Sequence, residues 1–497
     1  MKKIVYLCFL SLSLIACQKD TPSSDTTEDY LHIKHLGGQA TSNDLLGSSH
    51  AFSFPIPLNT EESELHLLGD ANFERNFSDD PSRPEYGLGP VFNNTSCLGC
   101  HNRDGRGSLP VGLNTSSWVR LNQNDSLFLR ISIEDDQLNE GPPTAVPGYS
   151  SQLFHLGSYG VRKDFPGVGQ AEVWIRYEES QFQYPDGEQI TLVKPLFKIE
   201  NPYDAYIDSS ERIQSRLWQT DVKTSPRMSL PLFGLGLLEA VPESDILNLA
   251  KVKHPEGVSG RPNYVLDINK VNTRDPFPYS LGRFGWKANS PSIEQQSLGA
   301  LNGDLGVTNY LFPEESIVNT KLYNDYVRGE ESFISHKNEA SDELAHSLVF
   351  YSSTLAVPPR RNINDPQVVQ GGRLFKSIRC TSCHVPQLTT GASSVSSLSY
   401  QRIFPFTDML LHDMGEGLAD HRQDFKANGR EWKTRPLWGV GLTQVVNPRA
   451  SFLHDGRART LEEAIVWHGG EAQYSRDQFI HLSKNQRQQV LAFLKSL

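Results

Sequence analysis

The sequence is poor in cysteine, in methionine and in long apolar stretches. Its 497 residues include six cysteines and four methionines, and its mean hydropathy is −0.44. Six cysteines are too few for a disulfide framework at this length, and no apolar run reaches the about 20 residues of a membrane-spanning helix. Basic runs are also absent, and a net charge of −11 excludes nucleic acid as a partner. These features indicate a globular chain of two or three domains.

The first 17 residues have the pattern of an export signal. Lys2 and Lys3 precede a short apolar stretch that ends in Leu-Ile-Ala-Cys17, which resembles a bacterial lipobox with Cys17 as the lipid-carrying residue. An ordinary secretory signal with a chance cysteine is the alternative. Residues 18–43 are rich in Thr, Ser, Asp and Lys, so we expect a flexible tether. The pattern predicts an extracytoplasmic protein, periplasmic or at the cell surface, that a lipid anchors to a bacterial membrane.

Four of the remaining cysteines form two copies of one motif. Residues 97–101 read Cys-Leu-Gly-Cys-His and residues 380–384 read Cys-Thr-Ser-Cys-His. C-x-x-C-H is the attachment signature of a c-type haem, in which the two thiols bond to the haem and the histidine ligates its iron. A zinc site would need a second ligand pair, and a redox dithiol would need a βαβ context. We therefore expect two covalent haems, held by Cys97, Cys100 and His101 and by Cys380, Cys383 and His384.

The chain carries signs of an internal duplication. Residues 231–237 echo residues 436–442, and residues 282–296 echo residues 456–464 in the same order. Helices are predicted from Pro366 up to the second motif, over 341–355, and at the chain end behind a Ser483/Gln486 capping box. The first half has a longer spacer, which reads as β-strands around a Tyr-Pro-Asp-Gly turn at 184–187. Similar glycine-rich phrases can also arise by chance.

These stretches resemble the di-haem oxidoreductase family, within the bacterial di-haem cytochrome c peroxidase superfamily. The matching residues are 89–107, 226–243, 282–306, 380–391, 410–420 and 452–472. The resemblance implies a mainly α fold of two tandem cytochrome c-like domains. We expect domains at 44–356 and 357–497, and a β-containing insertion at about 115–225 in the first. We also expect the insertion to shape access to the first haem.

The sixth ligand decides what each haem can do. The resemblance points to Met414 as the distal ligand of the second haem, with His412 and His454 as alternatives. Met409 lies in an apolar run and is expected in the core, and Met228 is a weaker candidate. Calcium between the domains occurs in some relatives, but no ligand loop for it is recognisable here.

Peroxide cleavage needs a group that moves a proton and a polar group beside it. The resemblance places Gln296 and Asp304 there, although Asp304 stands where related peroxidases have a longer Glu, and Glu239 is a reserve candidate. Trp286 is expected either between the haems as an electron bridge or in the core. Each carboxylate could instead be a surface or capping residue.

The resemblance implies reduction of hydrogen peroxide at the first haem, with electrons from a small redox protein such as a cytochrome entering at the second. Two other functions remain open. One is a di-haem oxidase that acts on another substrate, and the other is an electron carrier without enzymatic activity.

Overall fold

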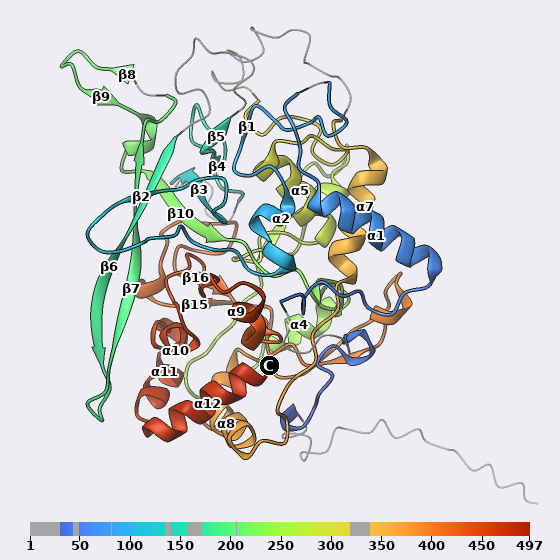
Figure 1. Cartoon of the computed structure of the whole chain (residues 1–497), viewed down its shortest axis with the longest axis vertical. Helices are drawn as coiled ribbons and strands as arrows, with labels where there is room; N and C mark the ends of the chain where they lie inside the picture. The colour runs from blue at the N-terminus through green and yellow to red at the C-terminus, as the bar shows by residue number, and fades with distance from the viewer. Residues whose placement is uncertain are drawn as a thin grey trace, which may run out of the picture.

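The computed structural model describes residues 30–42, 49–80, 82–134, 141–157, 171–204, 206–318 and 338–497. Most of its helices lie in two groups, one around α1 and α7 and the other around α8 and α12 (Figure 1). The helices are α1 Thr60–Glu74, α2 Cys97–Cys100, α3 Leu235–Glu239, α4 Glu243–Leu249, α5 Ile293–Leu305, α7 Asp342–Thr354, α8 Pro366–Ser377, α9 Thr443–Val446, α10 Leu461–Val466, α11 Gln473–Ile480 and α12 Lys484–Ser496.

The strands form small antiparallel sheets with the orders β10-β3-β4, β2-β6-β7, β1-β5, β8-β9, β11-β12, β13-β14 and β15-β16. Their bounds are β1 Val91–Phe92, β2 Val119–Arg120, β3 Leu127–Ile133, β4 Gln152–Leu153, β5 Leu156–Gly157, β6 Glu172–Gln183, β7 Gln189–Glu200, β8 Tyr206–Ile207, β9 Ile213–Gln214, β10 Val222–Met228, β11 Tyr264–Leu266, β12 Tyr279–Leu281, β13 Leu388–Thr389, β14 Arg402–Ile403, β15 Leu411–Asp413 and β16 Glu431–Lys433.

The fold is mixed rather than mainly α, which corrects the expected class. Helices make up 31% of the chain and strands 19%. With 38 glycines and 30 prolines, helices are interrupted often. Many strands are only two residues long, too short to show an alternating pattern in the sequence.

Two pairs of helices pack closely at a glycine. Gly371 of α8 packs on α12, where a Cβ would come 1.8 Å from the Gln489 carbonyl oxygen, and Gly69 of α1 packs on α7, where the distance to the Ser347 carbonyl oxygen would be 2.2 Å. Both pairs therefore approach so closely that only glycine fits. The predicted capping residues are observed as well: Asp365 caps α8, and Ser483 caps α12 with a full capping box.

Residues 30–42 pack in the core, so the flexible tether expected over 18–43 does not include them. Tyr30 and Leu31 are 4% and 1% exposed, and the Tyr30 hydroxyl donates to the Gly372 carbonyl at 3.0 Å. The buried guanidinium of Arg360 donates to the carbonyls of both residues. The apolar residues among the polar ones, Leu36 included, pack into the core. The leader, Cys17 and residues 18–29 lie outside the described residues, so these predictions stay untested.

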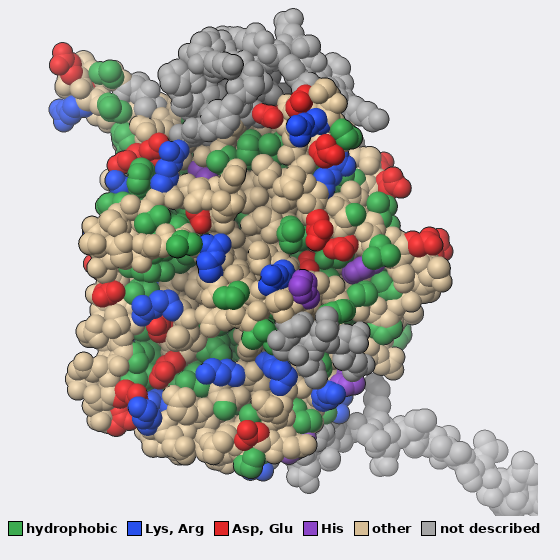
Figure 2. All heavy atoms as spheres, viewed as in Figure 1, with side chains coloured by type: hydrophobic (Ala, Val, Ile, Leu, Met, Phe, Trp, Pro, Cys, Tyr) green, Lys and Arg blue, Asp and Glu red, His purple; other side chains and the backbone are tan. Residues whose placement is uncertain are grey.

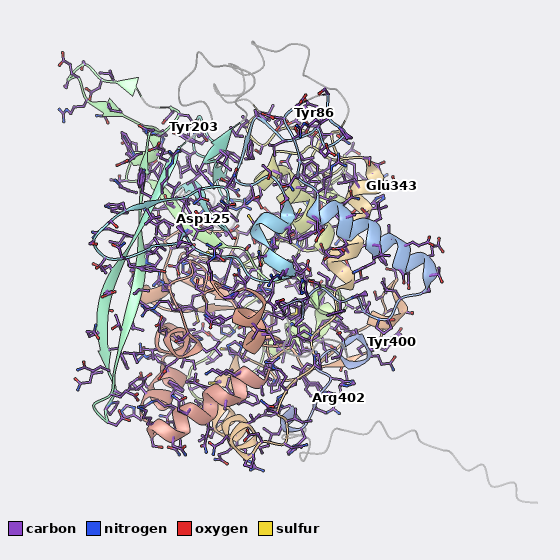
Figure 3. The ribbon with its side chains drawn as sticks, viewed as in Figure 1. Tyr86, Asp125, Tyr203, Glu343, Tyr400 and Arg402 are labelled. Carbon is purple, nitrogen blue, oxygen red and sulfur yellow. The ribbon has the colours of Figure 1, made fainter. Side chains whose placement is uncertain are left out.

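The predicted β-rich segment extends along the whole left side of the molecule in Figure 1. Strands β6 and β7 form a long hairpin from Glu172 to Glu200. Its turn reaches the C-terminal half, where Arg487 of α12 donates to Asp186 at 2.9 Å and Glu188 at 2.6 Å. Figure 3 shows Asp125 and Tyr203 of this segment on the opposite side from Glu343 of α7. The insertion thus lies against both halves.

One hydrophobic core contains residues from Tyr30 to Leu497, so it includes side chains of both halves. A second core packs β3 and β6 of the insertion against Trp286 and Trp432. The boundary at 356/357 stays a prediction. Among the helices that the structure describes, none combines the length and the apolar composition that crossing a membrane requires.

Candidate functional site

The first motif lies on α2 and the turn that follows it. The Ser96 hydroxyl caps α2 by accepting a hydrogen bond from the Gly99 amide at 3.1 Å. Cys97, Cys100 and His101 all line one cavity of about 510 Å³. The helix therefore presents both thiols and the imidazole to the same space.

The second motif is arranged in the same way around a second cavity. α8 leads into Arg379, whose φ of 68° turns the chain into the short 3-10 helix Cys380–Ser382. Cys380, Cys383 and His384 line a cavity of about 240 Å³ whose other walls are mostly apolar. The two motifs thus face separate cavities.

Both histidines are held in the orientation of a metal ligand. His101 Nδ1 donates to the Leu230 carbonyl at 2.7 Å, and His384 Nδ1 donates to the Phe406 carbonyl at 3.0 Å. This bond leaves Nε2 as the lone-pair nitrogen. Burial lowers the pKa of each imidazole to about 4, so both are neutral at pH 7 and able to ligate iron.

The four thiols fit haem attachment better than zinc or redox chemistry. Burial raises the pKa of Cys97 and Cys380 to about 12, whereas zinc ligation and disulfide exchange use thiolates of lowered pKa. None of the four thiols forms a disulfide. Within the described ranges, no group of three or more His, Cys, Asp or Glu could hold a metal ion. Two thiols and a neutral imidazole around an apolar cavity are the donor set of a c-type haem.

The first cavity also contains the predicted acid–base residues. Gln296 and Asp304 of α5 both line it. Asp304 Oδ1 accepts a hydrogen bond of 2.6 Å from Gln152 Nε2. Burial raises the pKa of the Asp304 carboxyl, while the charge of Arg130 acts in the opposite direction. Asp304 therefore lies in the same space as His101, as the resemblance implies.

Glu239, the reserve candidate, does not line this cavity. Its Oε1 accepts a hydrogen bond of 2.7 Å from the Ile293 amide at the start of α5, which makes it a partner of the helix N-terminus. Burial raises the pKa of Glu239. The structure thus brings Gln296 and Asp304 together and leaves Glu239 at the end of their helix.

The second cavity contains Met414, together with His412 and His454. His412 has both ring nitrogens engaged: Nε2 contacts Asp408 at 2.8 Å and Nδ1 contacts Glu471 at 2.9 Å. His454 stacks on Trp432 at 3.9 Å. The hydrogen bonds of His412 occupy both of its ring nitrogens, so Met414 and His454 stay the candidates for the distal ligand in this cavity. Met409 is 2% exposed and lines neither cavity, in line with the expected core position.

Trp286 lies where the two cavities meet, because it lines both. Its Nε1 donates to the Met228 carbonyl at 2.8 Å, and its ring contacts that of Trp432 edge-on at 6.3 Å. Trp286 also belongs to the second hydrophobic core, so both expectations for it, the electron bridge and the core residue, stay open.

Sequence reasoning missed several residues of the site: Gln152, Arg130, Arg106, Lys433 and Arg435. Gln152 and Arg130 come from β4 and β3 and are direct partners in the sheet register. No sequence pattern indicates these two residues, because the pairing of β3 with β4 forms only in the folded chain. Arg435 directly precedes the repeated Pro-Leu-Trp-Gly phrase, and a charge beside such an apolar phrase could have marked it.

Comparison with known proteins supports the haem interpretation. A family model described as "Di-haem oxidoreductase, putative peroxidase" matches residues 30–497. No curated protein sequence matches the chain. A solved structure of hydrazine synthase from Kuenenia stuttgartiensis, pressurized with xenon, is similar at 19% identity and a TM-score of 0.22; the match covers 35% of this chain and 62% of that one. Because the family model spans almost the whole described chain, the chain belongs to the di-haem oxidoreductase family.

Proposed function

We propose that the chain reduces hydrogen peroxide at the first cavity, with electrons that a donor delivers at the second. One peroxide, two electrons and two protons give two water molecules. The observation that carries this proposal is Asp304, a carboxyl of raised pKa in the same cavity as His101. The first cavity is also the larger one, about 510 Å³ against about 240 Å³. If both hold the same group, the first has more room for a substrate.

The residues of the first cavity have separate roles in this reaction. Haem held by Cys97, Cys100 and His101 supplies a redox-active iron when bound. Asp304 accepts a proton from one peroxide oxygen and returns it to the other. Gln152 fixes the carboxyl through Oδ1, and the positive charge of Arg130 stabilises the negative charge that develops as the O–O bond breaks.

The second cavity is suited to electron entry. A haem held here by Cys380, Cys383 and His384 would share the cavity with the Met414 thioether, and ligation by methionine would raise its reduction potential. Trp286 contributes a ring common to the walls of both cavities. We therefore assign acceptance of electrons to the second haem and chemistry to the first.

Asp304→Asn tests the catalytic assignment. The amide keeps the size of the side chain but cannot take up the proton, so kcat/KM for peroxide should fall by a factor on the order of 10²–10⁴. Asp304→Glu should retain most of the activity. Asp245→Asn, an exposed carboxylate on α4, is the control. Equal activity of Asp304→Asn and Asp245→Asn would contradict the role of Asp304.

Spectra of the haem-loaded protein distinguish the alternatives. A peroxidase should contain two covalent haems, with a high-spin signal from the first that changes when peroxide is mixed in. Met414→Ala should convert the second haem to high spin. Two permanently low-spin haems that ignore peroxide would favour the electron carrier, and a reaction with other substrates only would favour the oxidase.

The cellular setting belongs to the same proposal. Cys17 would carry lipid, with residues 18–29 as the shortened tether before the packed segment at Tyr30. Labelled palmitate should be incorporated into the wild type and not into Cys17→Ala. A basic cytochrome is a suitable donor, because the net charge of −11 attracts it at long range. Figure 2 shows acidic and basic side chains interspersed on the visible face, so the attraction proposed here comes from the net charge and not from a patch on this face.

A further inference from the structure

Three cationic side chains lie at the junction of the two cavities. Lys433 and Arg435 line both cavities, and Arg106 lines the second. Arg106 and Lys433 are 7% and 4% exposed. The guanidinium carbons of Arg106 and Arg435 lie 5.1 and 5.5 Å from the Trp286 ring centroid. Positive charge is thus concentrated around the one tryptophan that both cavities share.

Among the described residues, no carboxylate oxygen lies within 4.0 Å of these three cations, although Asp455 acts on Arg106 and Asp408 on Lys433 at longer range. Lys433 Nζ donates to the Arg283 carbonyl at 2.8 Å, and Arg106 donates to the carbonyls of Ser451 and Leu453. By contrast, the buried Lys287 contacts a carboxylate oxygen of Asp420 at 2.8 Å. The cluster formed by Arg106, Lys433 and Arg435 therefore differs from the ion pairs elsewhere in the interior.

Such a cluster is costly unless an anion joins it. Removing a cation from water is unfavourable when no opposite charge compensates, and neighbouring like charges add to that cost. Burial, together with the charge of Arg435, lowers the pKa of Arg106 to about 9. An anion in the second cavity would meet all three side chains, and an anion in the first would meet Lys433 and Arg435, because these residues form part of the cavity walls.

We propose that Arg106, Lys433 and Arg435 bind the carboxylate groups of both haems. This inference rests on the proposed occupation of each cavity by one covalent haem, a group that carries two carboxylates. The two groups together bring four carboxylates, and the three cations compensate three of these charges. The same contacts would bring the carboxylate edges of the two groups to the Trp286 region.

Arg435→Gln tests this assignment through redox potentials. A cation beside a haem favours the reduced form, so loss of the charge should lower the midpoint potentials of both haems in a spectroelectrochemical titration. Arg435→Lys should stay close to the wild type. Arg379→Gln is the matched control, since Arg379 lines only the second cavity; it should affect only the second haem. Unchanged potentials in Arg435→Gln, or a shift confined to one haem, would overturn the proposal.

A second measurement is independent of the first. The resonance Raman bending band of the haem carboxylates reports their hydrogen bonds, and it should shift in Arg435→Gln and in Lys433→Met. An unchanged band in both variants would overturn the proposal. Neither readout needs peroxide turnover. A protein that binds two haems but does not react with peroxide would therefore refute the proposed activity and leave the binding of the haem carboxylates by the three cations unaffected. A haem count on the wild type checks the occupation of the cavities separately.

Discussion

Lys287→Met should destabilise the protein strongly, because Lys287 is the centre of a buried ionic cluster. The side chains of Lys287 and Asp420 are both 0% exposed, and Nζ lies 2.8 Å from the Asp420 carboxylate. Nζ also donates to the carbonyls of Arg422 and Asn428 at 2.8 and 2.7 Å. All three ammonium hydrogens therefore have partners. Methionine fills a similar volume but leaves these three acceptors without that donor.

The size of the loss in free energy of unfolding depends on which hydrogen bonds Asp420 retains in the variant. Breaking a buried ion pair by removing one member costs about 3–5 kcal/mol. Asp420 retains the Ser225 hydroxyl at 2.6 Å and the Arg227 guanidinium at 3.1 Å, so the lower end of that range applies. The substitution also removes the penalty for burying the ammonium group, whose pKa burial lowers to about 8. We expect a loss of about 3 kcal/mol in the free energy of unfolding.

Urea unfolding of the haem-loaded protein, followed by far-ultraviolet circular dichroism, measures this loss. Lys253→Met, at an exposed lysine, should change the free energy of unfolding by less than about 0.5 kcal/mol. In the Lys287→Met background, Asp420→Asn should cost at least about 1 kcal/mol less than in the wild type, because the two residues share a bond. A loss below about 1 kcal/mol for Lys287→Met, or strictly additive effects, would refute the reasoning.

Three further predictions concern packing, pH and the hairpin. Gly371→Ala should reduce the yield and the melting temperature of haem-loaded protein, because the added Cβ would come 1.8 Å from the Gln489 carbonyl oxygen. Burial raises the pKa of Asp420, but its cationic partners lower it further, to about 2, from an unfolded value of 3.8. The free energy of unfolding should therefore fall as the pH drops from about 4 to about 2, and it should fall less steeply in Asp420→Asn. Arg487→Met should free the β6–β7 turn, seen as faster hydrogen exchange and proteolysis there with unchanged exchange in α1.

Features that depend on neighbouring residues were predictable from the sequence. Two thiols and a histidine within five positions define the haem motif, whatever the rest of the chain does. Helix ends follow the same logic, since Asp365 and Ser483 cap the helices that they directly precede. Met414, placed by resemblance, lines the expected cavity. Local chemistry thus gave the centre of each site.

Features that depend on long-range pairing were not predictable. Gln152 reaches Asp304 across about 150 positions in the chain, through the β3–β4 register and the position of α5. The segment 30–42 looks like a tether by composition, yet a few apolar residues suffice to hold it in the core. The short strands were not predictable for a related reason, because a strand of two residues has no alternating pattern in the sequence. The mixed α and β fold class is therefore evident only from the structure.

In the proposed function one motif, used twice, serves two roles, and the insertion supplies the difference between the two cavities. Both motifs hold their histidine through the same Nδ1–carbonyl bond, so the proximal sides do not distinguish the cavities. The cavities differ in the walls away from these histidines. The first cavity is lined by Gln152 and Arg130 from the insertion, whereas the second is lined by Met414 from the C-terminal half. The same insertion reaches α12 through Arg487. One segment therefore equips the first cavity with its polar residues and attaches the half that contains the second.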